Sequence, residues 1–130
     1  MDALIAAIQD RWQSNPALFS ALTGGMHLAQ EPAEKTQPYC VVTVSETPWW
    51  TFDNNFESYV VNFFLYSREE GPSVLLNIYA KLKVAYDEAD LSVTGYHVIR
   101  FWRVSSSPTQ KVDSVWVLAV EYNCELEQTS

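Results

Sequence analysis

The segment from Glu57 to Tyr66, ESYVVNFFLY, limits the possible folds of this chain more than any other segment. Its β-branched and aromatic residues are typical of a strand, in which successive side chains point to opposite faces of a sheet. One face would carry Tyr59, Val61, Phe63 and Leu65, and the other Val60, Asn62, Phe64 and Tyr66. Because both faces are largely apolar, we expect both to be covered. The domain's own helices are one cover, and a second copy of the sheet is a candidate for the other.

Three further segments are predicted to be strands. A β-branched run, YCVVTV, begins at Tyr39 between Pro38 and Pro48. A second strand is expected from Tyr96 to Val104, and a third from about Ser114 to Leu126. The last one alternates cleanly, and its apolar face consists of Trp116, Leu118, Val120, Tyr122, Cys124 and Leu126. Its other face changes from apolar to acidic along its length, so it is expected to pass from covered to solvated.

Two helices are predicted before the first strand. In residues 2–13 the apolar side chains form one stripe at helical spacing, made of Leu4, Ile5, Ile8 and Trp12. Asn15 and Pro16 are typical of an N-cap and a first helical residue. The short helix that follows is expected to turn Leu18, Phe19 and Leu22 inward and to end at the pair Gly24-Gly25.

A third helix is expected to start at Gly71-Pro72-Ser73. Its inner seam would consist of Leu75, Ile78, Tyr79, Leu82 and Tyr86, and its outer residues of Asn77, Lys81, Lys83 and Asp87. Two segments lack a helix or strand period: a long loop from Met26 to Pro38 and a connection from Thr47 to Asn55. Irregular segments of this length are often functional.

The predicted fold is α+β, with elements in the order α-α-β-β-α-β-β. It would form a four-stranded, mostly antiparallel sheet with helices packed on one face. The length of 130 residues suits a single domain spanning residues 1–130.

Composition excludes some function classes. The formal charge is −8, from 16 acidic and 8 basic residues, which disfavours a surface that binds duplex DNA. The aromatic share of 14% is more than a core of this size needs, so some aromatic residues are expected at an interface. The N-terminal segment lacks the features of a signal peptide, and no run approaches the ~20 apolar residues of a membrane span, so an intracellular soluble protein is expected.

Neither the cysteines nor the other polar residues form a recognisable catalytic or metal-binding pattern. Cys40 and Cys124 are expected to be buried, reduced thiols, and a disulfide would require that their strands be neighbours. A dyad of Cys40 with His27 or His97 lacks a supporting motif. The acidic residues Asp87, Glu88, Asp90 and the pair Glu69-Glu70 are expected to be solvated. We therefore expect no enzyme, no metal and no cofactor.

Six residues are candidates for an interface. Trp49, Trp50, Phe52 and Asp53 lie in the connection between two predicted strands. Tryptophan is enriched at interface hot spots, although the two tryptophans would equally serve as a plug on the subunit's own core. Arg100 and Arg103 are expected on opposite faces of their strand, where each would pair with an acid of a neighbouring strand or subunit or would simply be solvated.

The order of these elements resembles a known family. The resemblance rests on Pro38-Tyr39-Cys40-Val41-Val42, on the helix from Leu75 to Asp87 and on the strand from Val115 to Leu126. With the two N-terminal helices, the glycine pair and the long apolar strand, this pattern is similar to that of the tail terminators, or tail-completion proteins, of long-tailed bacteriophages, prophages and gene-transfer agents. It covers essentially the whole chain.

The resemblance implies a non-enzymatic virion protein, assembled in the bacterial host cytoplasm, that forms a hexameric ring on the finished tail tube. It implies three protein partners: further copies of the chain, the tail tube protein and the head–tail connector protein. The ring would stop tube elongation and join the head, and DNA would pass through its lumen without specific binding. No membrane partner is implied.

Two other classes of protein remain open. One is a dimeric α+β-barrel protein in which the sheet faces enclose a small molecule, as a binding protein or an enzyme. The other is a monomeric chaperone or adaptor, which the large apolar content disfavours. Solution mass and particle shape distinguish a dimer from a ring.

Overall fold

The structure is a computed structural model of the chain, and it describes residues 2–28, 38–47, 56–68, 71–87 and 90–129. Within these ranges three helices and six strands follow one another. They are α1 (Asp2–Ser14), α2 (Pro16–Ala21), β1 (Met26–Leu28), β2 (Tyr39–Thr47), β3 (Phe56–Ser67), α3 (Ser73–Tyr86), β4 (Tyr96–Ser106), β5 (Gln110–Val112) and β6 (Val115–Gln128). The order is therefore α-α-β-β-β-α-β-β-β.

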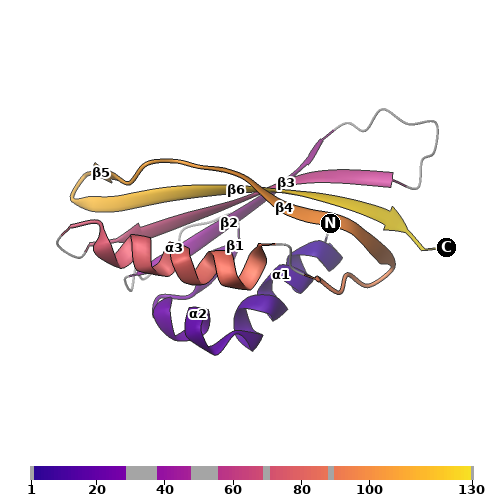
Figure 1. The fold of residues 1–130 in the computed structure, drawn as a ribbon, viewed down its shortest axis with the longest axis horizontal. Coiled ribbons are helices and arrows are strands. Elements are labelled where there is room, and N and C mark those ends of the chain that lie inside the picture. Colours follow the sequence, from indigo (N-terminus) through magenta and orange to yellow (C-terminus); the bar gives the residue numbers. More distant parts are fainter. Residues whose placement is uncertain (1, 29–37, 48–55, 69–70, 88–89, 130) are drawn as a thin grey trace.

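The strands form one mixed sheet with the order β1-β2-β3-β6-β4, and β5 pairs with β6. β1 runs parallel to β2, and every other pair is antiparallel. The three helices lie below one face of this long, twisted sheet, with α3 toward its β5 end and α1 toward the end that holds the C-terminus (Figure 1). The α+β class and the one-sided helical layer agree with the sequence prediction.

The predicted number of four strands was wrong, because two short strands were missed. The first, β1, begins the segment that was expected to be a loop up to Pro38. Met26 is buried and pairs with Cys40, and the Cys40 amide donates a hydrogen bond to the Gly25 carbonyl at 2.9 Å. The second, β5, lies between the two last predicted strands and forms a hairpin with β6. Three residues are too few to show a period of two.

Several local predictions for the N-terminal helices are confirmed. Asn15 caps α2, since its side-chain oxygen accepts a hydrogen bond from the Leu18 amide at 3.1 Å, and Pro16 is the first helical residue. Gly25 has a φ of +88°, the left-handed conformation that a glycine adopts without strain, but the helix ends before the predicted Gly24-Gly25 pair, at Ala21 with Leu22 as its C-cap. Phe19 contradicts its prediction, because its side chain is 47% exposed instead of turned inward.

One hydrophobic core fills the space between the helices and the lower face of the sheet. From the sheet it includes Tyr59, Val61, Phe63, Leu65, Phe101, Leu118, Val120, Tyr122, Cys124 and Leu126. Two hydrogen bonds join α1 to the end of α3: the Tyr86 hydroxyl donates to the Ile8 carbonyl at 2.6 Å, and Arg11 Nε donates to the Ala85 carbonyl at 2.8 Å. The helices are thus fixed to one another as well as to the sheet.

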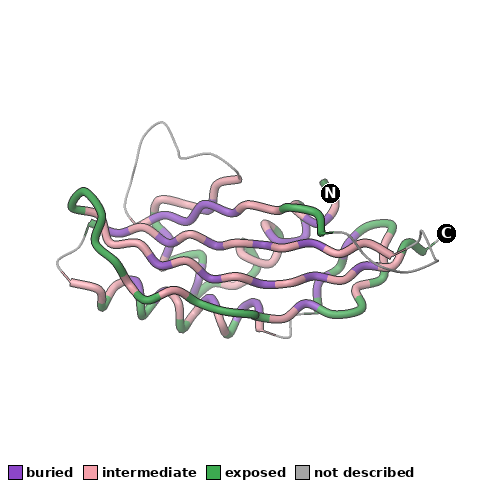
Figure 2. Tube along the Cα trace, turned by 90° about the horizontal axis from the view of Figure 1, so that it is seen from above, coloured by how far each residue is buried: buried purple, intermediate pink, exposed green. Residues whose placement is uncertain are grey.

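The opposite face of the sheet carries the alternate residues of each strand, and we call it the open face. Among the described residues, no helix covers it (Figure 2). On β3 it presents Val60, Asn62, Phe64 and Tyr66, all partly exposed. The Tyr66 ring stacks on Tyr39 of β2, with 4.8 Å between ring centroids. The strand that was expected to be covered twice is therefore covered once in the described part of the subunit.

Candidate interaction surfaces

Four of the six predicted interface residues, Trp49, Trp50, Phe52 and Asp53, lie outside the described residues. Their role remains a prediction. The other two, Arg100 and Arg103, belong to β4, which forms one edge of the sheet.

β4 is an irregular edge strand. Its pairing with β6 shifts between Val98 and Arg100 and again between Arg103 and Ser105. The two extra residues, Ile99 and Val104, are 43% and 47% exposed. Bulges and cationic side chains on an edge discourage the addition of another strand, so contacts made by this edge would use side chains more readily than backbone hydrogen bonds.

Arg103 faces the helices and binds the end of α3. Its guanidinium lies 3.2 Å from the Asp87 carboxylate and donates to the Tyr79 hydroxyl at 2.5 Å. The other Asp87 oxygen accepts a hydrogen bond from the Tyr122 hydroxyl of β6, also at 2.5 Å. The bond to Tyr79, together with the Asp87 charge, raises the pKa of Arg103. The expectation that Asp87 is a solvated outer residue was wrong, because two strands bind its carboxylate.

Arg100 lies on the open face. Its guanidinium carbon stacks over the Trp102 ring, 4.3 Å from the ring centre. Arg100 and Trp102 are two residues apart, whereas the intervening Phe101 is buried in the core beneath the helices. The two arginines therefore lie on opposite faces, as expected. Both side chains are exposed, but Arg103 is engaged with the end of α3, whereas Arg100 stacks on Trp102 of its own strand.

Cys40 and His27 cannot act together, because they face opposite sides of the sheet. Cys40 is fully buried in the core below the sheet, and burial raises its pKa far above the ordinary thiol value. His27 contacts Tyr39 edge-on, with 6.4 Å between ring centres, and bonds the Gly24 carbonyl through Nε2 at 2.7 Å. His97 lies exposed on β4.

Cys40 and Cys124 are free and buried. They belong to β2 and β6, which β3 separates. Cys40 pairs with Leu65, and Cys124 pairs with Tyr59 six residues away along β3. This separation is far beyond the Cα distance of about 4.4–6.8 Å that a disulfide requires. Burial also raises the pKa of Cys124, to about 12.

No group of three or more His, Cys, Asp or Glu residues within the described ranges is placed to hold a metal ion. Among the same residues, no helix is long and apolar enough to cross a membrane.

The open face changes in character along β6. Near β5 it carries Val117 and Ala119, and toward the C-terminus it carries Glu121, Asn123 and Glu125. Asn123 Oδ1 is buried and lacks a hydrogen-bond partner. An apolar area bordered by carboxylates suits a protein interface, whose centre is apolar and whose rim is polar.

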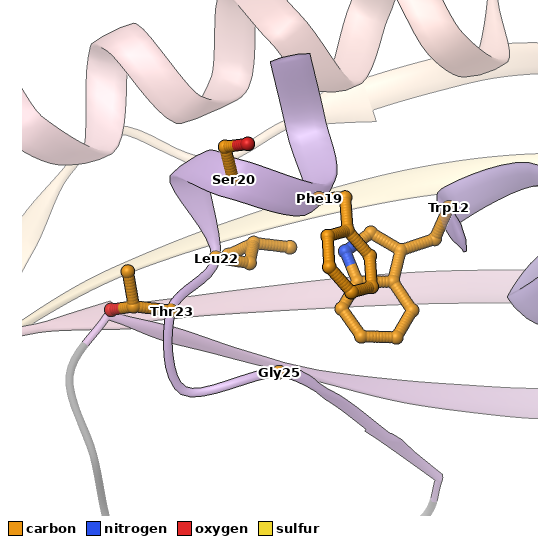
Figure 3. Close-up of a pocket in the computed structure, with 6 residues that line it drawn as sticks. All are labelled: Trp12, Phe19, Ser20, Leu22, Thr23 and Gly25. Carbon is orange, nitrogen blue, oxygen red and sulfur yellow. The ribbon is translucent and has the colours of Figure 1, made fainter. Parts of the chain in front are cut away.

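A small open pocket lies where α1, α2 and the turn before β1 meet (Figure 3). It has a volume of about 340 Å³ and is lined by Trp12, Phe19, Ser20, Leu22, Thr23 and Gly25. The exposed Phe19 ring lies against the Trp12 indole, with 4.9 Å between ring centres. The indole nitrogen is buried and lacks a hydrogen-bond partner. The pocket is a second candidate contact, and sequence analysis missed it because it placed Phe19 in the core.

The outward side of α3 carries an apolar stripe that sequence analysis also missed. Leu76 and Val84 are 50% and 79% exposed, and the exposed Ala80 lies midway between them. The signal is present in the sequence, since these residues recur every four positions, but the stronger inner seam of the same helix obscured it.

The chain was compared with known proteins. No family model and no curated protein matches it. Its fold is similar to that of a chain in the virion of a native gene transfer agent particle, with a TM-score of 0.75 and 15% sequence identity over 94% of this chain and 92% of that one. A second solved structure, known only by a sequence identifier, gives a TM-score of 0.72 and 11% identity over 99% and 96% of the two chains. These likenesses show a shared fold over nearly the full length.

Proposed function

We propose that this chain is a structural protein of a phage-like virion, and more narrowly a tail terminator. In this role it caps the tail tube as a ring, stops tube elongation and forms the surface to which the head joins. The proposal depends on one observation above all, the full-length likeness to a chain of a gene transfer agent virion. The order of elements in the sequence, which resembles that of tail terminators, supports the same assignment independently of the three-dimensional structure.

The surfaces of the subunit are consistent with this function. The open face exposes aromatic and aliphatic side chains on β3 and β6, and α3 exposes a second apolar stripe. Monomeric proteins rarely leave contiguous apolar surface uncovered unless it meets a partner. The proposed partners are further copies of this chain in a hexameric ring, the tail tube protein and the head–tail connector protein.

The charge of the chain suits a ring through which DNA passes. A formal charge of −8 on each subunit disfavours tight binding of phosphates, which would retain the DNA in the lumen. DNA is therefore proposed to pass without specific binding.

Deletion of the gene in cells that produce the particle tests the function. We expect tail tubes that exceed their normal length and lack heads, and a plasmid copy should restore particles of normal length. Electron microscopy of the lysate measures both. Tubes of normal length with attached heads in the deletion strain would exclude the terminator role.

The proposed contact through Trp49 and Trp50 is tested by replacing both with alanine. If they anchor an interface, tailed infectious particles are lost while the melting temperature stays unchanged. An early-melting protein, or normal particle yield, would assign the two tryptophans to packing within the subunit.

The dimeric α+β barrel remains the alternative, because in such a dimer the open faces of two subunits would pack against each other. Mass measurement of concentrated protein distinguishes the two. A stable dimer that encloses the open face favours the barrel, whereas ring-sized particles favour the terminator.

A further inference from the structure

We propose that α3 of one subunit packs against α1 of the next, so that subunits join head to tail through two different helices. This inference rests on the proposed function, because it names the surfaces through which the ring would form. It begins from the two outward helix faces of the described structure, which differ in both apolarity and charge.

The outward face of α3 is apolar and basic. Leu76, Ala80 and Val84 form one exposed row at intervals of four residues. Lys81 and Lys83 stand on either side of this row, and Lys83 Nζ lies 4.6 Å from the centre of the Tyr79 ring. Two of the eight basic residues of this acidic chain thus border Val84, whose side chain is 79% exposed.

The outward face of α1 is small and acidic. Asp2, Ala6 and Asp10 are exposed and also recur every four residues, while Leu4, Ala7 and Ile8 point into the core. α1 and α3 occupy different places below the sheet (Figure 1), so one subunit can use both faces at once.

The two rows have matching geometry and opposite charge. Each is a row of residues four apart with alanine at its centre, and two such rows interdigitate when helices cross at about −50°. Contact between Ala80 and Ala6 would bring the helices close together. Asp2 and Asp10 would then lie within reach of Lys81 and Lys83, around a buried centre formed by Leu76 and Val84.

The charge pattern favours a second copy of this chain over an unrelated acidic protein. A subunit with charge −8 repels its own copies, and contact of its lysines with its aspartates is an arrangement that offsets this repulsion. Because the two surfaces differ, the contact repeats from subunit to subunit and generates a ring if the rotation closes.

Charge exchange between the helices tests the contact. Lys81→Glu with Lys83→Glu, and separately Asp2→Lys with Asp10→Lys, should each weaken self-association at least about tenfold. An equal mixture of the two variants should assemble with alternating subunits. The acidic α3 of one variant then meets the basic α1 of the other, and the unchanged Lys81 and Lys83 meet the unchanged Asp2 and Asp10. Sedimentation velocity measures assembly, and the melting temperature verifies folding. Arg68→Glu with Lys111→Glu is the matched control, with the same change in charge at exposed positions on other elements, and it should assemble like the wild type.

A cysteine pair tests the same contact when free subunits associate only weakly. Ala6→Cys with Ala80→Cys should give a ladder of disulfide-linked multimers after mild oxidation, because the native Cys40 and Cys124 are buried. Ala6→Cys with Lys111→Cys, which moves the second thiol to β5, should not give this ladder.

Three results would overturn the proposed contact: no ladder from the 6/80 pair, an equal ladder from the 6/111 pair, or a charge mixture that stays unassembled under conditions in which the wild type assembles. If deletion of the gene still produced over-long tubes, the terminator function would stand and only this interface would fail. If deletion left normal particles while the 6/80 ladder formed, the interface would stand without the function.

Discussion

Asp87 is the residue that links the sheet to the end of α3. It ends the helix, and its carboxylate receives Tyr122 from β6 and Arg103 from β4. The Tyr122 side chain is fully buried and stacks on Phe101, with 5.0 Å between ring centres. Its hydroxyl therefore has little access to water, and Asp87 satisfies a polar group that would otherwise be costly to bury.

We predict that Tyr122→Phe destabilises the fold by about 2 kcal/mol, because it removes a hydrogen bond to a charged acceptor and keeps the ring. Urea denaturation measures the change. Tyr79→Phe is the control: it removes the bond that the exposed Arg103 donates, and its cost should stay below about 0.5 kcal/mol. A cost below about 0.5 kcal/mol for Tyr122→Phe would contradict the prediction and show that the Tyr122–Asp87 bond adds little to stability.

Buried tyrosines and cysteines make the fold sensitive to alkali. Burial raises the pKa of Cys124 to about 12 and raises the pKa values of Cys40, Tyr86 and Tyr122 still further above their ordinary values. In the unfolded chain these groups lose protons near pH 8.5 for cysteine and about 10 for tyrosine. The folded state holds protons that the unfolded state releases, so stability falls as pH rises.

We therefore predict that the free energy of unfolding declines from about pH 8.5 upward and continues to decline toward pH 12. The contribution of these four groups is fully present below pH 8.5, where both states are protonated. Urea denaturation at a series of pH values, under reducing conditions, measures the trend. Constant stability between about pH 8 and 10.5 would contradict the prediction.

At the scale of elements, the β5–β6 hairpin contains a tight turn whose residues are not typical of such turns. Val112 pairs with Val115, so only Asp113 and Ser114 form the turn. Their φ values are +50° and +67°, the conformation of the two-residue turns that match the twist of the strands. Such turns favour Asn-Gly or Asp-Gly, and serine at the second position is strained.

We predict that Ser114→Gly stabilises the protein by about 0.5–1 kcal/mol, because it relieves the left-handed strain at a smaller entropic cost. Ser105→Gly in β4, a strand position outside the residues of positive φ, should instead destabilise by about 0.5–1 kcal/mol. Thermal denaturation distinguishes the two. A destabilised Ser114→Gly protein would refute the proposed relief of strain.

At the scale of the whole molecule, one core joins all three helices to the sheet. The buried cluster extends from Leu4 of α1 through Leu18 of α2 and Leu82 of α3 to Leu126 of β6. Because the core is shared, unfolding of any one of the helices would expose the apolar side chains of the others and of the sheet.

We accordingly predict one cooperative unfolding transition, with the same midpoint by far-ultraviolet circular dichroism and by tryptophan fluorescence. Far-ultraviolet circular dichroism follows the backbone of helices and sheet, and Trp12 of α1 and Trp116 of β6 report on the packing of the helical layer and of the sheet. Separate midpoints would show that the chain contains two units and would contradict a single domain over residues 1–130.

The sequence by itself determined the elements with strong periodicity. The α+β class followed from the alternation in β3 and β6 and from the inner seam of α3. Burial of one face of a strand or helix leaves apolar residues at a regular spacing, which is visible in the sequence. The opposite orientations of Arg100 and Arg103 followed from the same period. These features depend on neighbours along the chain.

Only the tertiary structure decided what depends on neighbours in space. β1 and β5 are three residues each, and they exist because β2 and β6 offer backbone partners to which they can pair. Asp87 is a bound residue because Tyr122 and Arg103, far away in the sequence, converge on it. The exposed side chains of Phe19, Leu76 and Val84 became visible only when the helices were packed, since an apolar residue at a helical spacing does not reveal which of two faces meets the core.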